Sequence, residues 1–197
     1  LSSSSAASDV YKRQLLGYEA FENYTRLHSA PWMHRLKWPV YCFIAVSFWN
    51  LVGAGVFGFL INMPVSLFYI QGLNTTAVHA HTALFGVYGF LSLGFVFLIA
   101  RYIRPEVEFN DKLMKFGFWA LNIGLALMVL ISLLPIGLIQ SWASITHGLW
   151  FARSEEFMQQ PLLQNLRWLR MIGDTILIIG AVAFFWQIVK VLFTKKS

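Results

Sequence analysis

The stretch TAVHAHTALFGVYGFLSLGFVFLIA, from Thr76 to Ala100, contains no Asp, Glu, Lys or Arg. It is longer than the roughly 20 apolar residues with which a helix crosses the hydrocarbon core of a bilayer. Lipid offers the backbone no hydrogen-bond partners, so such a stretch must be a helix that pairs its own backbone groups. The sequence therefore predicts a membrane-spanning helix here. Two histidines, His79 and His81, lie near its start.

Three more stretches have the same character. They run from Trp38 to Ile61, from Phe116 to Ile139 and from Met171 to Phe193. The only charged residues in all four stretches are Asp174 and Lys190, both near the ends of the last one. We therefore predict an all-α integral membrane protein with four transmembrane helices. In the long connection between the third and fourth stretches, we expect one or two short interfacial helices.

The composition supports this prediction. Of the 197 residues, 57% are hydrophobic and only 12% are charged, whereas about a quarter are charged in soluble domains. The net charge of +6 does not indicate a nucleic-acid partner, because the basic residues gather at the ends of the apolar stretches rather than in one patch. The single cysteine, Cys42, excludes an internal disulfide and a cysteine-based metal site.

The distribution of Lys and Arg predicts the orientation of the helices. Basic residues concentrate before the first span, between the second and third spans, and at the C-terminal end; they are Arg26, Arg35, Lys37, Arg101, Arg104, Lys112, Lys115, Lys190, Lys195 and Lys196. The other side of the membrane has only Arg153, Arg167 and Arg170. Cytoplasmic loops carry the excess of basic residues. Both ends are thus expected in the cytoplasm, with His79 and His81 near the outer leaflet.

The N-terminal segment LSSSSAASDVYKRQ, residues 1–14, is polar and Ser-rich and differs from everything after it. It lacks the apolar stretch of a secretory signal. We interpret it as an unrelated or artefactual leader. Because the chain has no initiator Met, we expect residues 15–197 to be the C-terminal part of a longer transmembrane domain.

The spacing of the two histidines restricts what they can bind. Successive helical residues turn by about 100°, so His79 and His81 face opposite ways and are poorly placed to hold one metal ion. Two-histidine metal helices use a spacing of three or four residues. A spacing of two suits a helix between two cofactors, and a haem iron takes one axial histidine from a given side. Hydrogen-bonded helix contacts, a polar cavity, a proton relay or another metal site remain alternatives.

The neighbours on the two helix faces differ in size. Small residues share the face of His79, and we expect them to leave room for a flat macrocycle; they are Thr82, Ala83 and Gly86. Larger residues share the face of His81, where they could pack around a second ring; they are Leu84, Phe85 and Tyr88.

Several motifs carry a resemblance to a known family. They are FWNLVGAGVFGFLINMP, YIQGLNTTAVHAHTALFGVYG, LMKFGFWALNIGLALM and RMIGDTI, which begin at Phe48, Tyr69, Leu113 and Arg170. Together they resemble the catalytic subunit of haem–copper oxidases and nitric oxide reductases, and look most similar to the quinol-dependent, single-chain nitric oxide reductases. The resemblance covers about residues 15–195 and implies the last four helices of a twelve-helix core.

The resemblance implies a set of cofactors. His79 would ligate a high-spin b-type haem and His81 a low-spin b-type haem, on either side of one helix. The family also holds a non-haem iron, with ligands on earlier helices that are not in this chain. The remaining histidines match none of those motifs, and we expect them to be solvated or interfacial; they are His28, His34 and His147.

The resemblance also implies an activity. The longer protein would be a respiratory enzyme of a bacterial or archaeal cytoplasmic membrane, reducing nitric oxide to nitrous oxide with electrons from quinol. Its partners would be these substrates, membrane lipid and the remaining helices of the longer chain, with the oligomeric state open. Alternatives are an oxygen-reducing cbb-type oxidase, a non-catalytic diheme electron carrier, and a haem-free transporter or structural subunit.

Further polar residues in the spans are functional candidates. An intramembrane carboxylate such as Asp174 indicates function, and Arg170 lies four residues before it, within pairing distance on a helix. This pair would contact haem propionates or a proton path; a structural ion pair is the alternative. For Asn50, Asn62 and Asn122 we expect hydrogen bonds between helices, with a proton or water path as the alternative.

Overall fold

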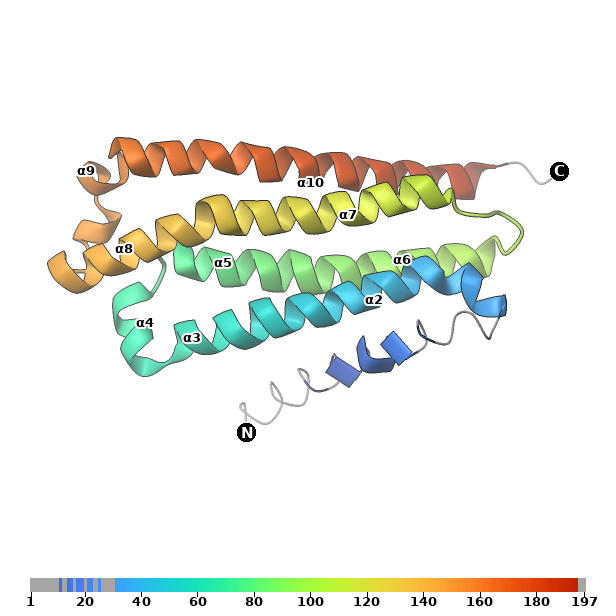
Figure 1. Cartoon of the computed structure of the whole chain (residues 1–197), viewed down its shortest axis with the longest axis horizontal. Helices are drawn as coiled ribbons and strands as arrows, with labels where there is room; N and C mark the ends of the chain where they lie inside the picture. Colours follow the sequence, from blue (N-terminus) through green and yellow to red (C-terminus); the bar gives the residue numbers. More distant parts are fainter. Residues whose placement is uncertain are drawn as a thin grey trace.

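The computed structural model describes residues 31–194 together with residues 11, 14–15, 17–19, 21–22 and 25. Within these residues the chain forms helices joined by short connections and contains no strand (Figure 1), so the predicted all-α class is confirmed. Most of the predicted leader and His28 lie outside the described residues.

Four long helices dominate the fold. The first three are each made of consecutive segments with a π-helical stretch in the middle, which divides each of them into smaller elements. The first helix contains η1 (Pro31–Leu36), α2 (Lys37–Trp49), η2 (Asn50–Phe57) and α3 (Gly58–Asn62). The second contains α5 (Asn74–Ala83), η3 (Leu84–Gly89) and α6 (Phe90–Ile103). The third contains α7 (Asp111–Leu127), η4 (Met128–Leu133) and α8 (Leu134–His147), and the fourth is α10 (Pro161–Phe193).

All four long helices have the length and composition to cross a membrane. Their bounds as candidate spans are His34–Asn62, Asn74–Ile103, Asp111–His147 and Pro161–Phe193. Each contains one of the apolar stretches identified in the sequence and extends beyond it, because a helix continues past the hydrocarbon core for as long as its backbone remains paired. The number of transmembrane helices predicted from the sequence is therefore confirmed.

Short helices connect the long ones at one end of the bundle. They are α4 (Pro64–Ile70), η5 (Phe151–Arg153) and α9 (Glu155–Met158). The last two lie in the connection for which short helices were expected, but that connection is shorter than the sequence suggested. The third long helix continues to His147, and the fourth begins at Pro161, a residue that favours the first turn of a helix.

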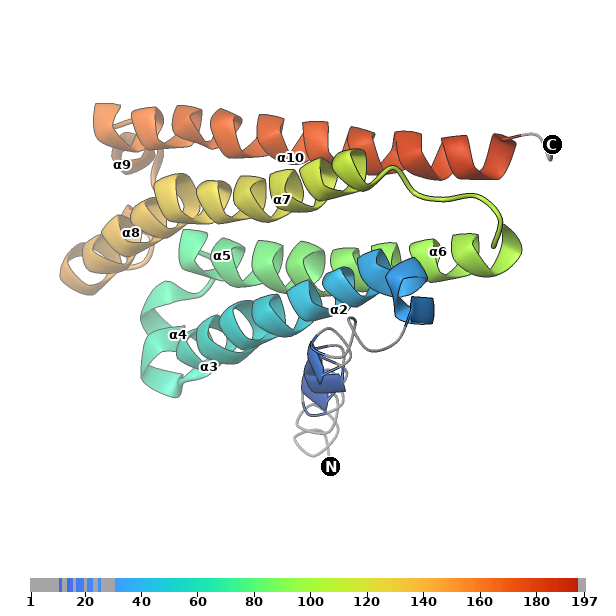
Figure 2. The same ribbon diagram turned by 45° about the vertical axis from the view of Figure 1, so that its right-hand side comes forward.

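The long helices lie side by side in the order of the chain, and each packs chiefly on its sequence neighbours (Figures 1 and 2). The start of α2, the end of α6, the start of α7 and the end of α10 meet at one end of the bundle. We call this the basic end, because it carries Arg35, Lys37, Arg101, Arg104 and Lys112. The opposite end, with α4 and α9, is called the loop end.

Glycines allow the third and fourth helices to approach closely. A Cβ atom on Gly124 would lie 2.6 Å from the backbone nitrogen of Leu177, and one on Gly173 would lie 2.5 Å from that of Met128. No larger residue fits at either position without separating the two backbones. Such contacts between small residues are typical of helix packing in membranes.

Aromatic rings fill the centre of the bundle. Phe97 and Phe184 are almost completely buried and meet edge to face, with ring centroids 4.8 Å apart. Phe118, in the same buried cluster, contacts the rings of Phe90 and Trp38. Many other large apolar side chains are exposed on the outside of the bundle, as expected for helices that face lipid or further helices.

Candidate functional site

His79 and His81 both lie on α5, and a buried glutamine holds the start of that helix. The side-chain oxygen of Gln140 accepts hydrogen bonds from the backbone nitrogen and the side-chain nitrogen of Asn74, each at 2.9 Å. The Gln140 amide donates to the carbonyl of Ala152 at 3.1 Å. Gln140 therefore connects α5 to α8 and to the η5 turn, and thereby positions the helix that carries both histidines.

The imidazole of His79 faces the first long helix. Its Nδ1 lies 2.8 Å from the carbonyl oxygen of Gly53 in η2. Because a carbonyl oxygen only accepts hydrogen bonds, Nδ1 carries a proton and donates it, which leaves Nε2 as the ring nitrogen available to a ligand. Within the described residues, no hydrogen bond engages this Nε2. The ring is thus oriented by one nitrogen and free to bind through the other.

Gly53 reaches His79 because the first and second helices are in close contact. A Cβ atom on Gly53 would lie 2.4 Å from Oγ1 of Thr82 and 2.9 Å from its carbonyl carbon. A Cβ on Gly58, one turn later, would lie 3.0 Å from Cε1 of the His79 ring. Both glycines thus lie where the two helices approach closely, as small residues commonly do in membranes. Their contacts with the histidine ring depend on how the two helices are aligned.

The imidazole of His81 faces the fourth long helix instead. Its Nδ1 lies 2.8 Å from the carbonyl oxygen of Ala77, one turn earlier on the same helix. Its Nε2 lies 3.2 Å from Nη2 of Arg170 on α10. An arginine only donates, so Nε2 accepts and Nδ1 carries the proton. The two rings therefore contact different helices, as the two-residue spacing predicts.

Arg170 also forms the ion pair expected from the sequence. Its Nε lies 3.0 Å from one carboxylate oxygen of Asp174 and 3.4 Å from the other. The two side chains are 37% and 36% exposed in this chain. The contact between Arg170 and His81 was not predicted, because the two residues are 89 positions apart in the sequence and no local pattern connects them.

One expectation about the helix faces is wrong. Thr82 and Gly86 share the face of His79, but both are buried against the first long helix, so the space at these two positions is filled by a helix rather than left for a macrocycle. A Cβ on Gly86 would lie 2.6 Å from Cγ of Trp49. Small residues on this face allow two helices to approach, which is their commoner use in membranes.

The face of His81 is more open. Leu84 is 63% exposed and Tyr88 is 47% exposed, whereas Phe85 is half-buried and packs against the core. That these three side chains pack around a second ring stays a prediction.

The other polar candidates have different surroundings. Asn122 accepts a hydrogen bond from Nε1 of Trp49 at 2.9 Å and so links two helices, as expected. Asn62 bonds to its own helix, at the carbonyl of Gly58, so the expected contact between helices is wrong there. The Asn50 amide is fully buried and has no hydrogen-bond partner among the described residues. His34 and His147 are exposed.

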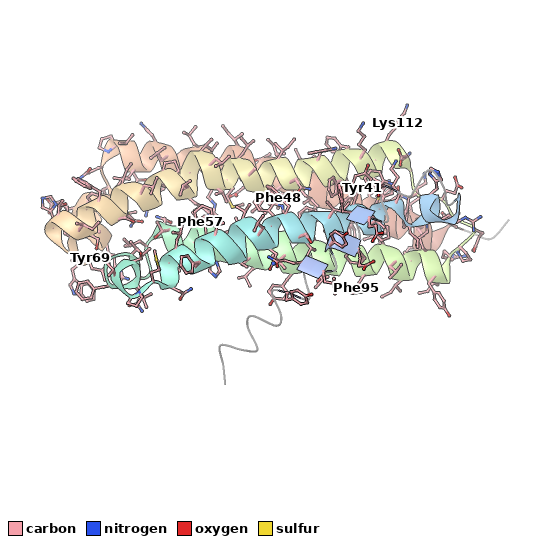
Figure 3. The ribbon with its side chains drawn as sticks, turned by 60° about the horizontal axis from the view of Figure 1, so that its bottom comes forward. Tyr41, Phe48, Phe57, Tyr69, Phe95 and Lys112 are labelled. Atoms are coloured by element: carbon pink, nitrogen blue, oxygen red, sulfur yellow. The ribbon has the colours of Figure 1, made fainter. Side chains whose placement is uncertain are left out.

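An apolar groove of about 600 Å³ lies between the first and third long helices. Tyr41, Phe48 and Phe57 line it from the first helix (Figure 3), and Trp119 is among the residues that line it from the third. Neither His79 nor His81 reaches it. It is therefore separate from the two histidine rings.

The donor groups limit the cofactors that this chain can hold. Among the described residues, no group of three His, Cys, Asp or Glu side chains is placed to hold a metal ion. Two imidazoles instead each contact a backbone carbonyl through Nδ1, which leaves Nε2 of each to a ligand on a different face of one helix. A haem iron, whose other ligands come mostly from the porphyrin, needs only one such nitrogen on a side. These histidines thus fit the axial ligands of two haems better than a shared metal ion.

Two comparisons with known proteins concern the family of the chain. A nitric oxide reductase subunit from Stutzerimonas stutzeri is 27% identical over 155 residues, which represent 73% of this chain and 32% of that protein. The chain thus spans about a third of the length of the curated relative it matches. Residues 16–176 match the family described as cytochrome c and quinol oxidase polypeptide I. With four helices able to cross a membrane and this match over most of its length, the chain is a multi-pass membrane protein that belongs to the cytochrome c and quinol oxidase polypeptide I family.

Proposed function

We propose that this chain is the C-terminal part of a respiratory membrane oxidoreductase and supplies one axial histidine to each of two b-type haems. His79 would ligate the high-spin haem and His81 the low-spin haem. The observation that carries the proposal is the hydrogen bonding of the two imidazole rings. Each donates from Nδ1 to a backbone carbonyl and keeps Nε2 as a lone-pair donor, on opposite faces of α5.

The hydrogen bond between His79 and Gly53 has a chemical role in this proposal. Ligating histidines commonly donate their other ring N–H to a carbonyl or carboxylate, which fixes the ring and raises the basicity of the ligating nitrogen. The Gly53 carbonyl provides this contact from a different helix. The relative position of the first two helices thus sets the direction of the His79 lone pair.

Arg170 and Asp174 are proposed to serve the low-spin haem. Arg170 donates to the nitrogen of His81 that would bind iron, so its side chain must turn away when that nitrogen is a ligand. Asp174, four residues later, retains an ion-pair partner for the guanidinium. A guanidinium suits the carboxylates of haem propionates, which it binds by two parallel hydrogen bonds. We propose that, when haem is bound, the Arg170 guanidinium leaves the His81 ring and forms hydrogen bonds with a haem propionate instead.

The proposed reaction is the reduction of nitric oxide. Two nitric oxide molecules, two electrons and two protons give nitrous oxide and water, with quinol as the proposed electron donor. The haems would carry the electrons, and α5 would hold the two haems on its two faces. The similarity to a protein named as part of a nitric oxide reductase supports this choice of substrate. Ligands for the proposed non-haem iron would come from the remaining helices of the longer protein.

The orientation in a bacterial or archaeal cytoplasmic membrane is part of the proposal. Arg35, Lys37, Arg101 and Arg104 lie at the basic end, whereas the loop end has Arg153 and Arg167 with Arg170. The excess of positive charge would place the basic end in the cytoplasm. Both histidines would then lie toward the outer leaflet, because α5 starts at the loop end.

The test is the visible absorption spectrum of the full-length protein with single histidine substitutions. His81→Ala should remove the low-spin haem bands and leave the high-spin haem bound, because the two rings face different helices. His79→Ala should weaken the high-spin haem alone. His147→Ala is a matched control, since that ring is exposed at the end of α8. If both substitutions removed the same bands equally, or no haem bands were present, the ligand assignment would be wrong.

A second candidate is an oxygen-reducing enzyme, such as one of cbb type, because the family description names oxidases. The two candidates share the haem ligands and differ in the gas that is consumed. Measuring nitric oxide and oxygen consumption by the purified full-length protein, with quinol as reductant, separates them. Oxygen consumption without nitric oxide consumption would exclude the first candidate and leave the haem assignment intact.

A further inference from the structure

A groove of about 540 Å³ lies at the basic end, where the η1 turn meets the last two turns of α6. Leu36, Leu98 and Ile99 provide apolar walls, and two basic side chains, Arg35 and Arg101, also line it. The volume is within the range of about 300–1,000 Å³ that is usual for small-molecule sites. The groove thus combines apolar surface with positive charge.

The two arginines of the groove have no ion-pair partner among the described residues. The Arg35 side chain is exposed and makes no hydrogen bond there. Arg101 donates to the carbonyls of Arg35 and Val107, and its guanidinium lies 4.6 Å from the centre of the Phe109 ring. These contacts orient Arg101 without neutralising it. Glu108 attracts Arg101 electrostatically but forms no ion pair with it.

Neighbouring basic residues at the same end are engaged differently. Lys37 lies 2.9 Å from a carboxylate oxygen of Asp111. Arg104 pairs with Glu106 at 3.3 Å and donates to carbonyls at the end of α10. Their charges are thus used to hold the bundle together. Arg35 and Arg101, by contrast, line the groove without an ion-pair partner among the described residues.

The groove also lies at the depth of a membrane surface. Arg35 lies at the start of the first candidate span and Arg101 near the end of the second. Tyr102 also lines the groove and is 89% exposed, and tyrosines are enriched at the boundary between hydrocarbon and water. A ligand here would have an anionic part among the arginines and an apolar part along α6.

We infer that this groove binds an anionic phospholipid. The guanidinium groups of Arg35 and Arg101 hold the phosphate, and the acyl chains lie against Leu98 and Ile99. A free phosphate ion would interact with the same guanidinium groups but would gain nothing from the apolar walls. A zwitterionic lipid would gain less from the positive charge, because its headgroup carries no net negative charge. The inference does not depend on which gas the longer protein reduces.

The test compares two single substitutions in the full-length protein, reconstituted in phosphatidylcholine vesicles with or without phosphatidylglycerol. Arg35→Gln removes one exposed charge of the groove without disturbing a contact within the described residues. Lys112→Gln is the matched control. It removes an equal charge from an exposed residue at the same end (Figure 3) that does not line the groove. Lipid that stays bound after purification is counted by native mass spectrometry, and a photoactivatable phosphatidylglycerol maps its position.

Arg35→Gln should lower phosphatidylglycerol retention about fivefold, the effect of one basic residue near an anionic surface. Lys112→Gln should leave retention unchanged, and the photolabel should react within residues 98–102. Equal retention in both variants would overturn the inference, as would equal retention of phosphatidylcholine. Displacement of the photolabel by inorganic phosphate as effectively as by phosphatidylglycerol would show a simple anion site and would also overturn it. The absorption spectrum should be the same in both variants.

Discussion

His79 and His81 are separated by one residue, yet different parts of the molecule orient them. The Nδ1 atom of His79 is held by a carbonyl of another helix, and its ring is close to Gly58 of that helix. The Nδ1 atom of His81 is held by a carbonyl one turn earlier on its own helix. The first ring therefore depends on how two helices pack, and the second depends on local helix geometry.

The two surroundings also differ in how open they are. The face of His79 is closed by the first helix at Thr82 and Gly86. The face of His81 exposes Leu84 and Tyr88 and has an arginine as its polar neighbour. Substitutions in the first helix should thus affect His79 selectively, and substitutions in the fourth helix should affect His81 selectively. Three sets of variants test this separation, from the largest expected effect to the smallest.

Gly53→Ala should have the largest effect. The new methyl group would lie 2.4 Å from Oγ1 of Thr82, so the first two helices must separate, at a cost of about 1–3 kcal/mol. The full-length protein should unfold at a lower temperature and lose high-spin haem absorbance before low-spin absorbance. Gly55→Ala is the control, because its new methyl group would meet only the carbonyl of Asn50, at 3.3 Å. Equal loss of both haems in Gly53→Ala would contradict the proposed separation.

Arg170→Ala should have an intermediate effect that is limited to the low-spin haem. The substitution removes one charged hydrogen-bond donor, which is worth about 1.5 kcal/mol or more, so retention of the low-spin haem should fall about tenfold. Haem content is measured from absorbance after gel filtration of the full-length protein. The control is Arg167→Ala, an exposed residue one turn earlier on α10. If Arg167→Ala lost as much low-spin haem, the effect of Arg170→Ala would come from removing a positive charge from this part of α10 and not from a specific contact of Arg170.

Gly58→Ala should have the smallest effect. Its methyl group would lie 3.0 Å from Cε1 of His79, a distance that a small tilt of the ring relieves at a cost of about 1 kcal/mol. The high-spin haem should remain bound with shifted absorption bands, and the low-spin bands of the same sample serve as the internal control. A shift of the low-spin bands instead would mean that this glycine does not act through His79.

Much of the fold could be predicted from local sequence. A run of apolar residues longer than the bilayer core forms a helix wherever it occurs, so four spans follow from length and composition alone. Helix ends are less predictable, because their positions depend on terminal contacts. Pro161 begins α10 well before the apolar stretch at Met171, and His147 ends α8 well after Ile139.

The candidate site could be predicted only in part. The opposite directions of His79 and His81 and the pairing of Arg170 with Asp174 both follow from the turn of a single helix. The role of small residues on the His79 face could not be deduced in this way. Thr82 and Gly86 could have bordered a ligand or another helix, and only the position of Trp49 on the neighbouring helix decides between them.

The sequence by itself determined that the protein has four membrane helices, that two imidazoles leave one helix in opposite directions, and that basic residues collect at one end. Each of these depends on chain length, composition or the 100° turn of a helix, which are local properties. Only the tertiary structure decided that Gly53 orients His79, that Arg170 reaches His81, and that Arg35 and Arg101 share a groove. These contacts join residues far apart in the chain, and they form only when the packing of whole helices fixes their alignment.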